Sequence, residues 1–182
     1  GDDLLTRLLA VRGDGGDDGD ALSDDDMISL VLLLVVAGHE TTAHLIGNAA
    51  LALLRHPDQK ARLALEPALL PRAVEEFLRY DGPVDLSTLR YAREDVDFGG
   101  VAINRGDLVL AVLNSANRDE REHADPDRLD LARGSRGHLA FGHGIHFCLG
   151  APLARLEGEI AIGTLLARLP ELRLAVPESE LQ

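Results

Sequence analysis

The 182-residue chain is predicted to be mainly α-helical with a small β-sheet. Aromatic residues make up only 3% of it, so Leu, Ala and Val must build the core, which favours helices. Apolar residues recur at helical spacing in the longest segments. Short apolar or alternating runs lie between residues 86 and 113, separated by glycine-containing turns, and predict the sheet. The length allows one domain, 1–182, and Gly1 in place of Met favours a partial one.

The amino-terminal part is predicted to hold two helices. Residues 2–11 form a short amphipathic pattern, followed by an acidic, glycine-rich loop over 12–22. Ser23 and Asp26 then have the spacing of a capping box, and acidic residues suit a first helical turn. A long helix is expected over 24–55, because a proline follows shortly after it.

The middle of this long helix, A-G-H-E-T-T over 37–42, is expected to be interrupted. Gly38 and the adjacent β-branched residues Thr41 and Thr42 weaken a helix. Glu40 costs free energy in an apolar stretch unless it meets water or a partner. One interpretation is a locally opened helix that presents a carbonyl, a hydroxyl and a carboxylate to a small wet pocket. The other is an ordinary helix with Glu40 on a solvated face.

A further helix over 71–80 places Glu76 and Arg79 on one face, where they can pair. An exposed pair of this kind carries little weight by itself. Strands are expected over 86–92, 101–103 and 108–113. Residues 114–150 then read as an irregular segment ahead of a last helix over 150–168.

Cys148 is the only cysteine, and it stands between glycines just before the helix over 150–168. Unpaired N–H groups and the positive dipole end of a helix favour an anion, so a thiolate acting as metal ligand or nucleophile is one interpretation. A buried cysteine packed as a small hydrophobe is the other. Gly142, Gly144 and Gly150 remove three Cβ atoms nearby, which gives a large flat group room against the backbone.

Composition excludes some partners and compartments. The formal charge of −13 argues against nucleic acids and anionic membranes. A single cysteine allows no intrachain disulfide, no leading apolar stretch resembles a signal peptide, and the cytoplasm is expected. The apolar run over 30–37 is shorter than the ~20 residues that a membrane span needs. Residues 131–156 contain arginines but no acid, which predicts a site for an acidic partner or is an accidental gap.

Four segments in order resemble the carboxy-terminal half of the cytochrome P450 family. They are A-G-H-E-T-T over 37–42, E-F-L-R over 76–79, D-P-D-R over 125–128 and F-G-H-G-I-H-F-C-L-G over 141–150. The resemblance implies the carboxy-terminal part of the haem-thiolate monooxygenase fold, with 114–150 as the meander and haem loop. A complete family member is about twice as long as this chain.

The resemblance also implies roles for particular residues. Cys148 would be the iron ligand of haem b, and Glu40 and Thr41 would relay protons during oxygen activation. Arg128 in the meander would join the Glu76–Arg79 pair, although Leu129 and His123 stand where the family usually has aromatic residues. The residues implied to contact or surround the haem are Ala37, Gly38, Arg90, Phe141, Gly142, His146, Cys148 and Gly150. The other interpretation of Arg90 is an arginine on a strand that faces solvent and has no role in the site.

A family member of this kind inserts one oxygen atom of O₂ into a small organic molecule, with electrons from NAD(P)H through a ferredoxin-type donor. Arg133 and Arg136 are the expected docking residues, and the complete protein is expected to be a monomer without membrane or nucleic-acid partners. One alternative is a non-catalytic fragment that does not retain haem. Another is a zinc or cysteine-hydrolase site of Cys148, His138, His143 and His146, against which the absence of C-x-x-C and H-E-x-x-H argues.

Overall fold

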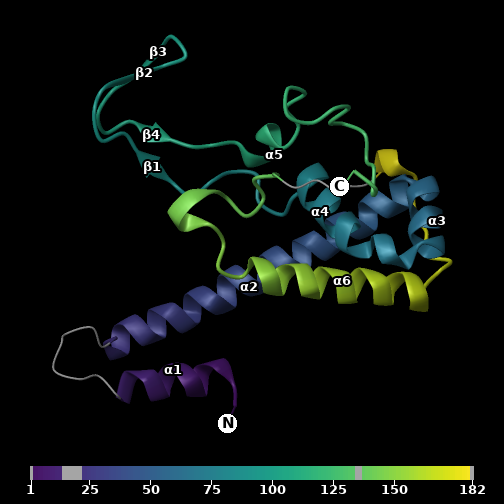
Figure 1. Cartoon of the computed structure of the whole chain (residues 1–182), viewed down its shortest axis with the longest axis horizontal. Helices are drawn as coiled ribbons and strands as arrows, with labels where there is room; N and C mark the ends of the chain where they lie inside the picture. The colour runs from purple at the N-terminus through teal and green to yellow at the C-terminus, as the bar shows by residue number, and fades with distance from the viewer. Residues whose placement is uncertain (1, 14–21, 134–136, 181–182) are drawn as a thin grey trace. The chain divides into compact units, whose positions relative to one another are not determined.

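The computed structural model describes residues 2–13, 22–133 and 137–180. Most of the expected acidic loop over 12–22, namely 14–21, and the expected docking residue Arg136 lie outside these residues. The described part is mostly helical with a small β region (Figure 1), so the predicted fold class is confirmed. Contacts divide the chain into two compact units, Gly1–Glu40 and Thr41–Gln182, which we describe separately.

The first unit contains helix α1 (Leu4–Gly13) and the beginning of helix α2 (Asp24–Arg55). The predicted capping box at the start of α2 is present. The Asp26 N–H donates to Ser23 Oγ at 3.1 Å, and the Ser23 N–H donates back to Asp26 Oδ2 at 3.1 Å. Three acidic residues occupy the first turn, where they meet the positive end of the helix dipole. These local interactions explain why the helix begins at Asp24.

Helix α2 is continuous through residues 37–42, so the expected interruption is wrong. A glycine costs about 1 kcal/mol in a helix and a threonine less, whereas a helix already nucleated on both sides gains a hydrogen bond for each residue that it includes. The hydrogen bonds gained by continuing the helix therefore outweigh the low helix propensity of the glycine and the threonines. The local opening that would have exposed a carbonyl beside Glu40 does not occur.

By length and composition, helix α2 could cross a membrane: it has 32 residues, and an 18-residue window within it has a mean hydropathy of 1.5. The sequence expectation considered only the uninterrupted apolar run over 30–37, whereas a span tolerates the few polar residues that α2 contains. Within the first unit this helix leaves large side chains exposed, and only 11% of its apolar window is buried. The exposed ones include Ile28, Leu32, Leu33, Val35 and Val36.

The second unit contains the hydrophobic core. Its helices are α3 (Pro57–Leu65), α4 (Leu70–Tyr80), α5 (Leu113–Ala116) and α6 (Ala151–Arg168), with 3₁₀ turns η1 (Pro67–Leu69), η2 (Gly144–His146) and η3 (Glu178–Glu180). Helix α4 packs against α6. The core residues around this contact include Leu45, Leu53, Leu63, Val74, Phe77, Leu78, Leu131 and Ile162.

Glycines in α6 let α4 and α6 approach closely. A Cβ atom on Gly158 would lie 3.4 Å from both Leu45 Cδ2 and Val74 Cγ1, and one on Gly163 would lie 2.9 Å from Leu70 Cδ2. Side chains at these positions would push the helices apart. The helix carrying Glu75 and Glu76 is thereby held against the helix that follows the cysteine.

The β region consists of two antiparallel pairs rather than one sheet. Strand β1 (Arg90–Tyr91) pairs with β4 (Leu108–Val109), and β2 (Val96–Phe98) pairs with β3 (Val101–Ile103). The predicted strand over 101–103 matches β3, those over 86–92 and 108–113 are longer than β1 and β4, and β2 was missed. Gly99 and Gly100 form the turn between β2 and β3, both with positive φ, so the turn was identifiable from the sequence although the strand before it was not.

Candidate functional site

The loop over 141–150 presents Cys148 at the surface. The Cys148 N–H donates to the Phe141 carbonyl at 2.9 Å, and the Phe147 N–H donates to the Gly144 carbonyl at 3.0 Å. Gly142 and Gly144 have φ of 72° and 76°, which side chains rarely adopt, so glycine is required at both turns. Cys148 is exposed, and the alternative of a buried core cysteine is therefore wrong.

Apolar side chains around the sulfur are unusually exposed. Ile145 is 97% exposed, Leu149 is 89% exposed, and Phe147 is half exposed. Open space surrounds Gly144, where a Cβ atom would meet no heavy atom within 4 Å. A thiol donor in an apolar, glycine-lined surface fits a large flat group such as haem, which would cover these side chains. The loop alone therefore brings together Phe141, Gly142, His146, Cys148 and Gly150.

The alternative zinc set is not assembled. Among residues 2–13, 22–133 and 137–180, no three His, Cys, Asp or Glu side chains gather closely enough to bind a metal ion. His138 instead lies 3.1 Å from a carboxylate oxygen of Glu75 through its Nε2. His146 is exposed in η2.

A charged cluster joins α4, α6 and the segment before the cysteine loop. Arg155 holds Glu75 with two hydrogen bonds, Nε to Oε1 at 2.5 Å and Nη2 to Oε2 at 3.0 Å. His138 approaches Glu75 Oε2 from the other side. Burial raises the pKa of Glu75, but the hydrogen bonds from His138 and Arg155, with the positive charge of Arg155, lower it from 4.5 to about 2. The three residues line an open pocket of about 880 Å³ between α4 and α6.

The lowered pKa of Glu75 predicts a pH dependence of stability. Because the folded pKa of about 2 lies below the ordinary 4.5, the stabilisation is complete above pH 4.5 and is lost as the pH falls toward 2. As the pH falls from 6 to 2, we expect the free energy of unfolding of Glu75→Gln to fall by about 1–2 kcal/mol less than that of the unsubstituted protein, after allowance for solvent screening. Urea unfolding at several pH values between 2 and 6 measures it.

The control is Glu157→Gln, which removes a carboxylate of α6 outside this cluster. It should follow the pH dependence of the unsubstituted protein. If Glu75→Gln also follows it, the ion pair does not stabilise the fold.

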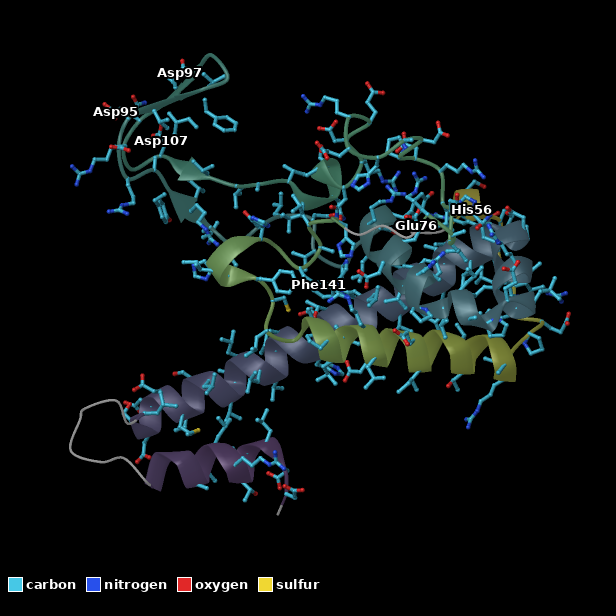
Figure 2. The ribbon with its side chains drawn as sticks, viewed as in Figure 1. His56, Glu76, Asp95, Asp97, Asp107 and Phe141 are labelled. Atoms are coloured by element: carbon cyan, nitrogen blue, oxygen red, sulfur yellow. The ribbon has the colours of Figure 1, made fainter. Side chains whose placement is uncertain are left out.

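The predicted Glu76–Arg79 pair is present and completely buried, with both side chains 0% exposed. Arg79 donates from Nε to Glu76 Oε2 and from Nη2 to Glu76 Oε1, each at 2.9 Å. Its Nη1 donates to the carbonyls of Asn117 at 3.0 Å and Pro126 at 2.8 Å. The pair therefore anchors the meander to α4, as the resemblance implied. Glu76 is labelled in Figure 2.

The third member of this network is Arg133 and not Arg128. Arg133 Nε donates to Glu76 Oε1 at 3.1 Å. Arg128 contributes its carbonyl, which accepts from Arg133 Nη2 at 3.0 Å and from Arg79 Nη2 at 3.4 Å. The P-x-R spacing could not separate a side-chain role from a backbone role. Arg133 is 17% exposed and bound to Glu76, and its expected role as a docking residue stays a prediction.

The other predicted site residues lie on α2 and β1. Ala37, Gly38 and Glu40 belong to the first unit, and Thr41 begins the second. Glu40 is exposed, and a Cβ atom on Gly38 would meet no heavy atom within 4 Å, so there is open space beside it. Arg90 is exposed on β1 and donates from Nη1 to Thr88 Oγ1 and to the Leu89 carbonyl. Roles for these residues remain predictions.

Sequence reasoning missed the cluster of Glu75, His138 and Arg155. The ion pair joins residues 80 positions apart, and the contact of His138 joins residues 63 apart. Only the acid-free segment over 131–156 was a signal for it, and that segment was interpreted as a docking site. Within it, Arg133 binds Glu76 and Arg155 binds Glu75.

Comparison with known proteins identifies one family. The model of the family described as Cytochrome P450 matches residues 2–170. Cytochrome P450 107B1 of Saccharopolyspora erythraea is 54% identical over all 182 residues, which cover 44% of that protein. Vitamin D(3) 25-hydroxylase of Pseudonocardia autotrophica is 54% identical over 180 residues, 99% of this chain and 44% of that protein.

A solved structure, the tirandamycin C-bound P450 monooxygenase TamI, superposes with a TM-score of 0.91 at 47% identity. The superposition covers 100% of this chain and 45% of TamI. The chain thus spans less than half the length of the relatives that it matches.

Proposed function

Because the chain belongs to the cytochrome P450 family, we propose that it is the haem-binding part of a monooxygenase that inserts one oxygen atom of O₂ into a small organic molecule. The single observation that carries the proposal is the exposed thiol of Cys148 on a glycine-turned, apolar loop. Relatives at about half identity are named as hydroxylases or monooxygenases, which supports the same reaction class.

Family members use haem b, and we propose that the residues of the cysteine loop hold it here. Cys148 Sγ would ligate the iron, and Phe141 would pack beside the sulfur. His146 and Arg90 would pair with the propionates, since both are exposed cationic or hydrogen-bonding groups. When bound, haem b supplies the redox-active iron at which O₂ is reduced and the substrate oxidised.

The residues of α2 would handle protons and space. We propose that the Thr41 hydroxyl and the Glu40 carboxylate move protons from solvent toward the reacting oxygen. Glu40 is exposed and so can exchange protons with water. Ala37 and Gly38 have small side chains, and the open space beside Gly38 leaves room for a substrate. Ala37 and Gly38 would therefore leave room for the substrate and would take no part in the proton transfer.

We propose a ferredoxin-type electron donor with NAD(P)H as the source of electrons, a cytoplasmic location and a monomeric complete protein. The support for the donor is family membership and not surface charge. Two of the arginines in the acid-free segment, Arg133 and Arg155, are already bound to Glu76 and Glu75.

A second candidate is a non-catalytic fragment that does not retain haem. In such a protein Ile145 and Leu149 would stay 97% and 89% exposed, with no haem to cover them. A purified protein that is colourless, with no Soret band after addition of hemin, would identify this case.

The proposal is tested by Thr41→Ala in protein that shows a Soret band. We expect haem binding to be unchanged, because Thr41 lies on α2 and not in the cysteine loop. Without the hydroxyl, proton delivery should fall and reducing equivalents should be diverted to peroxide, with product per NAD(P)H reduced roughly tenfold. Peroxide and product are measured with any substrate that the unsubstituted protein turns over.

Thr41→Ser is the matched control, because it keeps the hydroxyl and loses only a methyl group. It should restore most of the coupling. Normal coupling in Thr41→Ala would exclude the proton-relay role.

A further inference from the structure

Arg155 contacts two different groups at once. Its guanidinium binds both carboxylate oxygens of Glu75 at 2.5 and 3.0 Å, and the same group lies over the ring of Phe141, 4.6 Å from the ring centroid. A planar guanidinium can chelate a carboxylate in its plane while it stacks on an aromatic ring, which an ammonium group cannot do. Figure 2 marks Phe141 near the beginning of α6, the helix that carries Arg155.

Two further aromatic rings lie near Phe141. The His138 ring lies 5.9 Å away and the Phe147 ring 6.2 Å away between centroids. Its carbonyl accepts the Cys148 N–H at 2.9 Å. The position of this ring therefore depends on α4 through Glu75, on α6 through Arg155 and on the cysteine loop itself.

The ion pair that holds Arg155 is partly buried. The Arg155 side chain is 34% exposed and that of Glu75 is 20% exposed, so solvent screens their attraction only in part. The hydrogen bond to Glu75 is the main cause that raises the pKa of Arg155.

We propose that Arg155, anchored by Glu75, is a positioning residue that holds the Phe141 ring against the cysteine loop. This inference rests on the proposed function in one respect: the position of the ring matters to catalysis only if Cys148 is an iron ligand. The Phe141 carbonyl accepts the Cys148 N–H, so a displaced Phe141 changes the hydrogen bonding beside the ligand and with it the potential of the iron site. A purely structural ion pair would join α4 to α6 without affecting the ring or the iron.

The first experiment needs no haem. The four Phe residues are labelled with 4-fluorophenylalanine, and the Phe141 resonance in the ¹⁹F NMR spectrum is assigned with Phe141→Leu. Arg155→Gln is expected to shift the Phe141 resonance and to leave that of Phe77, in the core, in place. Glu75→Gln, which frees Arg155 without removing it, should shift the same resonance.

Two controls separate positioning from charge. Arg168→Gln removes a positive charge from the last turn of the same helix and should leave the Phe141 resonance unchanged. Arg155→Lys keeps the charge but loses the planar group, so it should shift the resonance nearly as far as Arg155→Gln. An unchanged Phe141 resonance in both Arg155→Gln and Glu75→Gln overturns the inference.

The second experiment uses the haem-loaded protein and measures the reduction potential of the iron. Arg155→Gln should shift the ferric–ferrous equilibrium about three- to tenfold, and tenfold corresponds to about 59 mV for one electron. Arg155→Lys, which also loses the planar group that stacks on Phe141, should shift it nearly as far, and Arg168→Gln should not change it.

The two experiments distinguish the inference from the proposed function. If haem binds and Arg155→Gln leaves the potential unchanged, the inference is wrong while the proposed function stands. If no haem binds, the proposed function fails for this chain, and the Phe141 resonance alone decides whether Arg155 positions the ring.

Discussion

Replacing Cys148 with Ser is expected to abolish the thiolate-type spectrum of the reduced carbon monoxide complex. A serine hydroxyl remains protonated near neutral pH, so it cannot supply the anionic sulfur donor. Because Cys148 is the only cysteine of the chain, no other side chain can replace its sulfur. We expect complete loss of the characteristic band, with haem content reduced at least tenfold. Difference spectroscopy and haem extraction measure the two effects.

Leu149→Ala is the matched control for this substitution. It removes an exposed apolar side chain next to the sulfur, 89% exposed, and keeps the thiol and the glycine turns. The band should keep its thiolate type in this variant. A Cys148→Ser protein with an unchanged band would refute the assignment of the iron ligand.

Arg79→Ala is expected to destabilise the protein by about 3–5 kcal/mol. The substitution leaves the Glu76 carboxylate buried with one fewer cation, and it leaves the carbonyls of Asn117 and Pro126 without their donor. An uncompensated buried charge costs far more than an exposed ion pair contributes. Urea unfolding measures the change in the free energy of unfolding, and the soluble yield gives a second measure.

Arg62→Ala provides the comparison for Arg79→Ala. Arg62 also pairs with two acids, Glu66 and Asp130, but at 3.7 Å and with a side chain that is 39% exposed. Its removal should cost no more than about 0.5–1 kcal/mol. If both variants lose the same stability, the buried network does not anchor the meander.

Local patterns predicted the elements whose signals lie close together in the sequence. The capping box of Ser23 and Asp26 marked the start of α2, and the pair of Glu76 and Arg79 marked one face of α4. The paired glycines marked the hairpin turn of β2 and β3. Each of these features depends on residues within about one helical or hairpin turn, so the sequence contains the complete interaction.

Local propensity failed where it competed with a larger structure. Gly38 and Thr41 predicted a break in α2 that the continuous helix does not have. In the β region the error had the opposite sign. The alternation of apolar and polar residues predicted longer strands than β1 and β4, which pair over two residues each. In both cases the cost or gain per residue is small beside the effect of the neighbouring elements.

The cysteine loop could be recognised from the sequence because its chemistry lies within ten consecutive residues. Glycines, an aromatic residue and one thiol at fixed spacing leave few alternatives, and the exposure of Cys148 agrees with the prediction of a ligand. The order of four such segments then identified the family, which the match over residues 2–170 confirms.

The sequence by itself therefore determined the family, the helical class and the loop that carries the sulfur. Only the tertiary structure decided that Arg133 rather than Arg128 completes the Glu76 network, and that Arg155 joins Glu75 to Phe141. The physical reason is the range of the interaction. A turn or a cap is built by neighbours in the chain, whereas the partner of a guanidinium is set by how α4 and α6 pack, and residues far apart in sequence supply its acceptors.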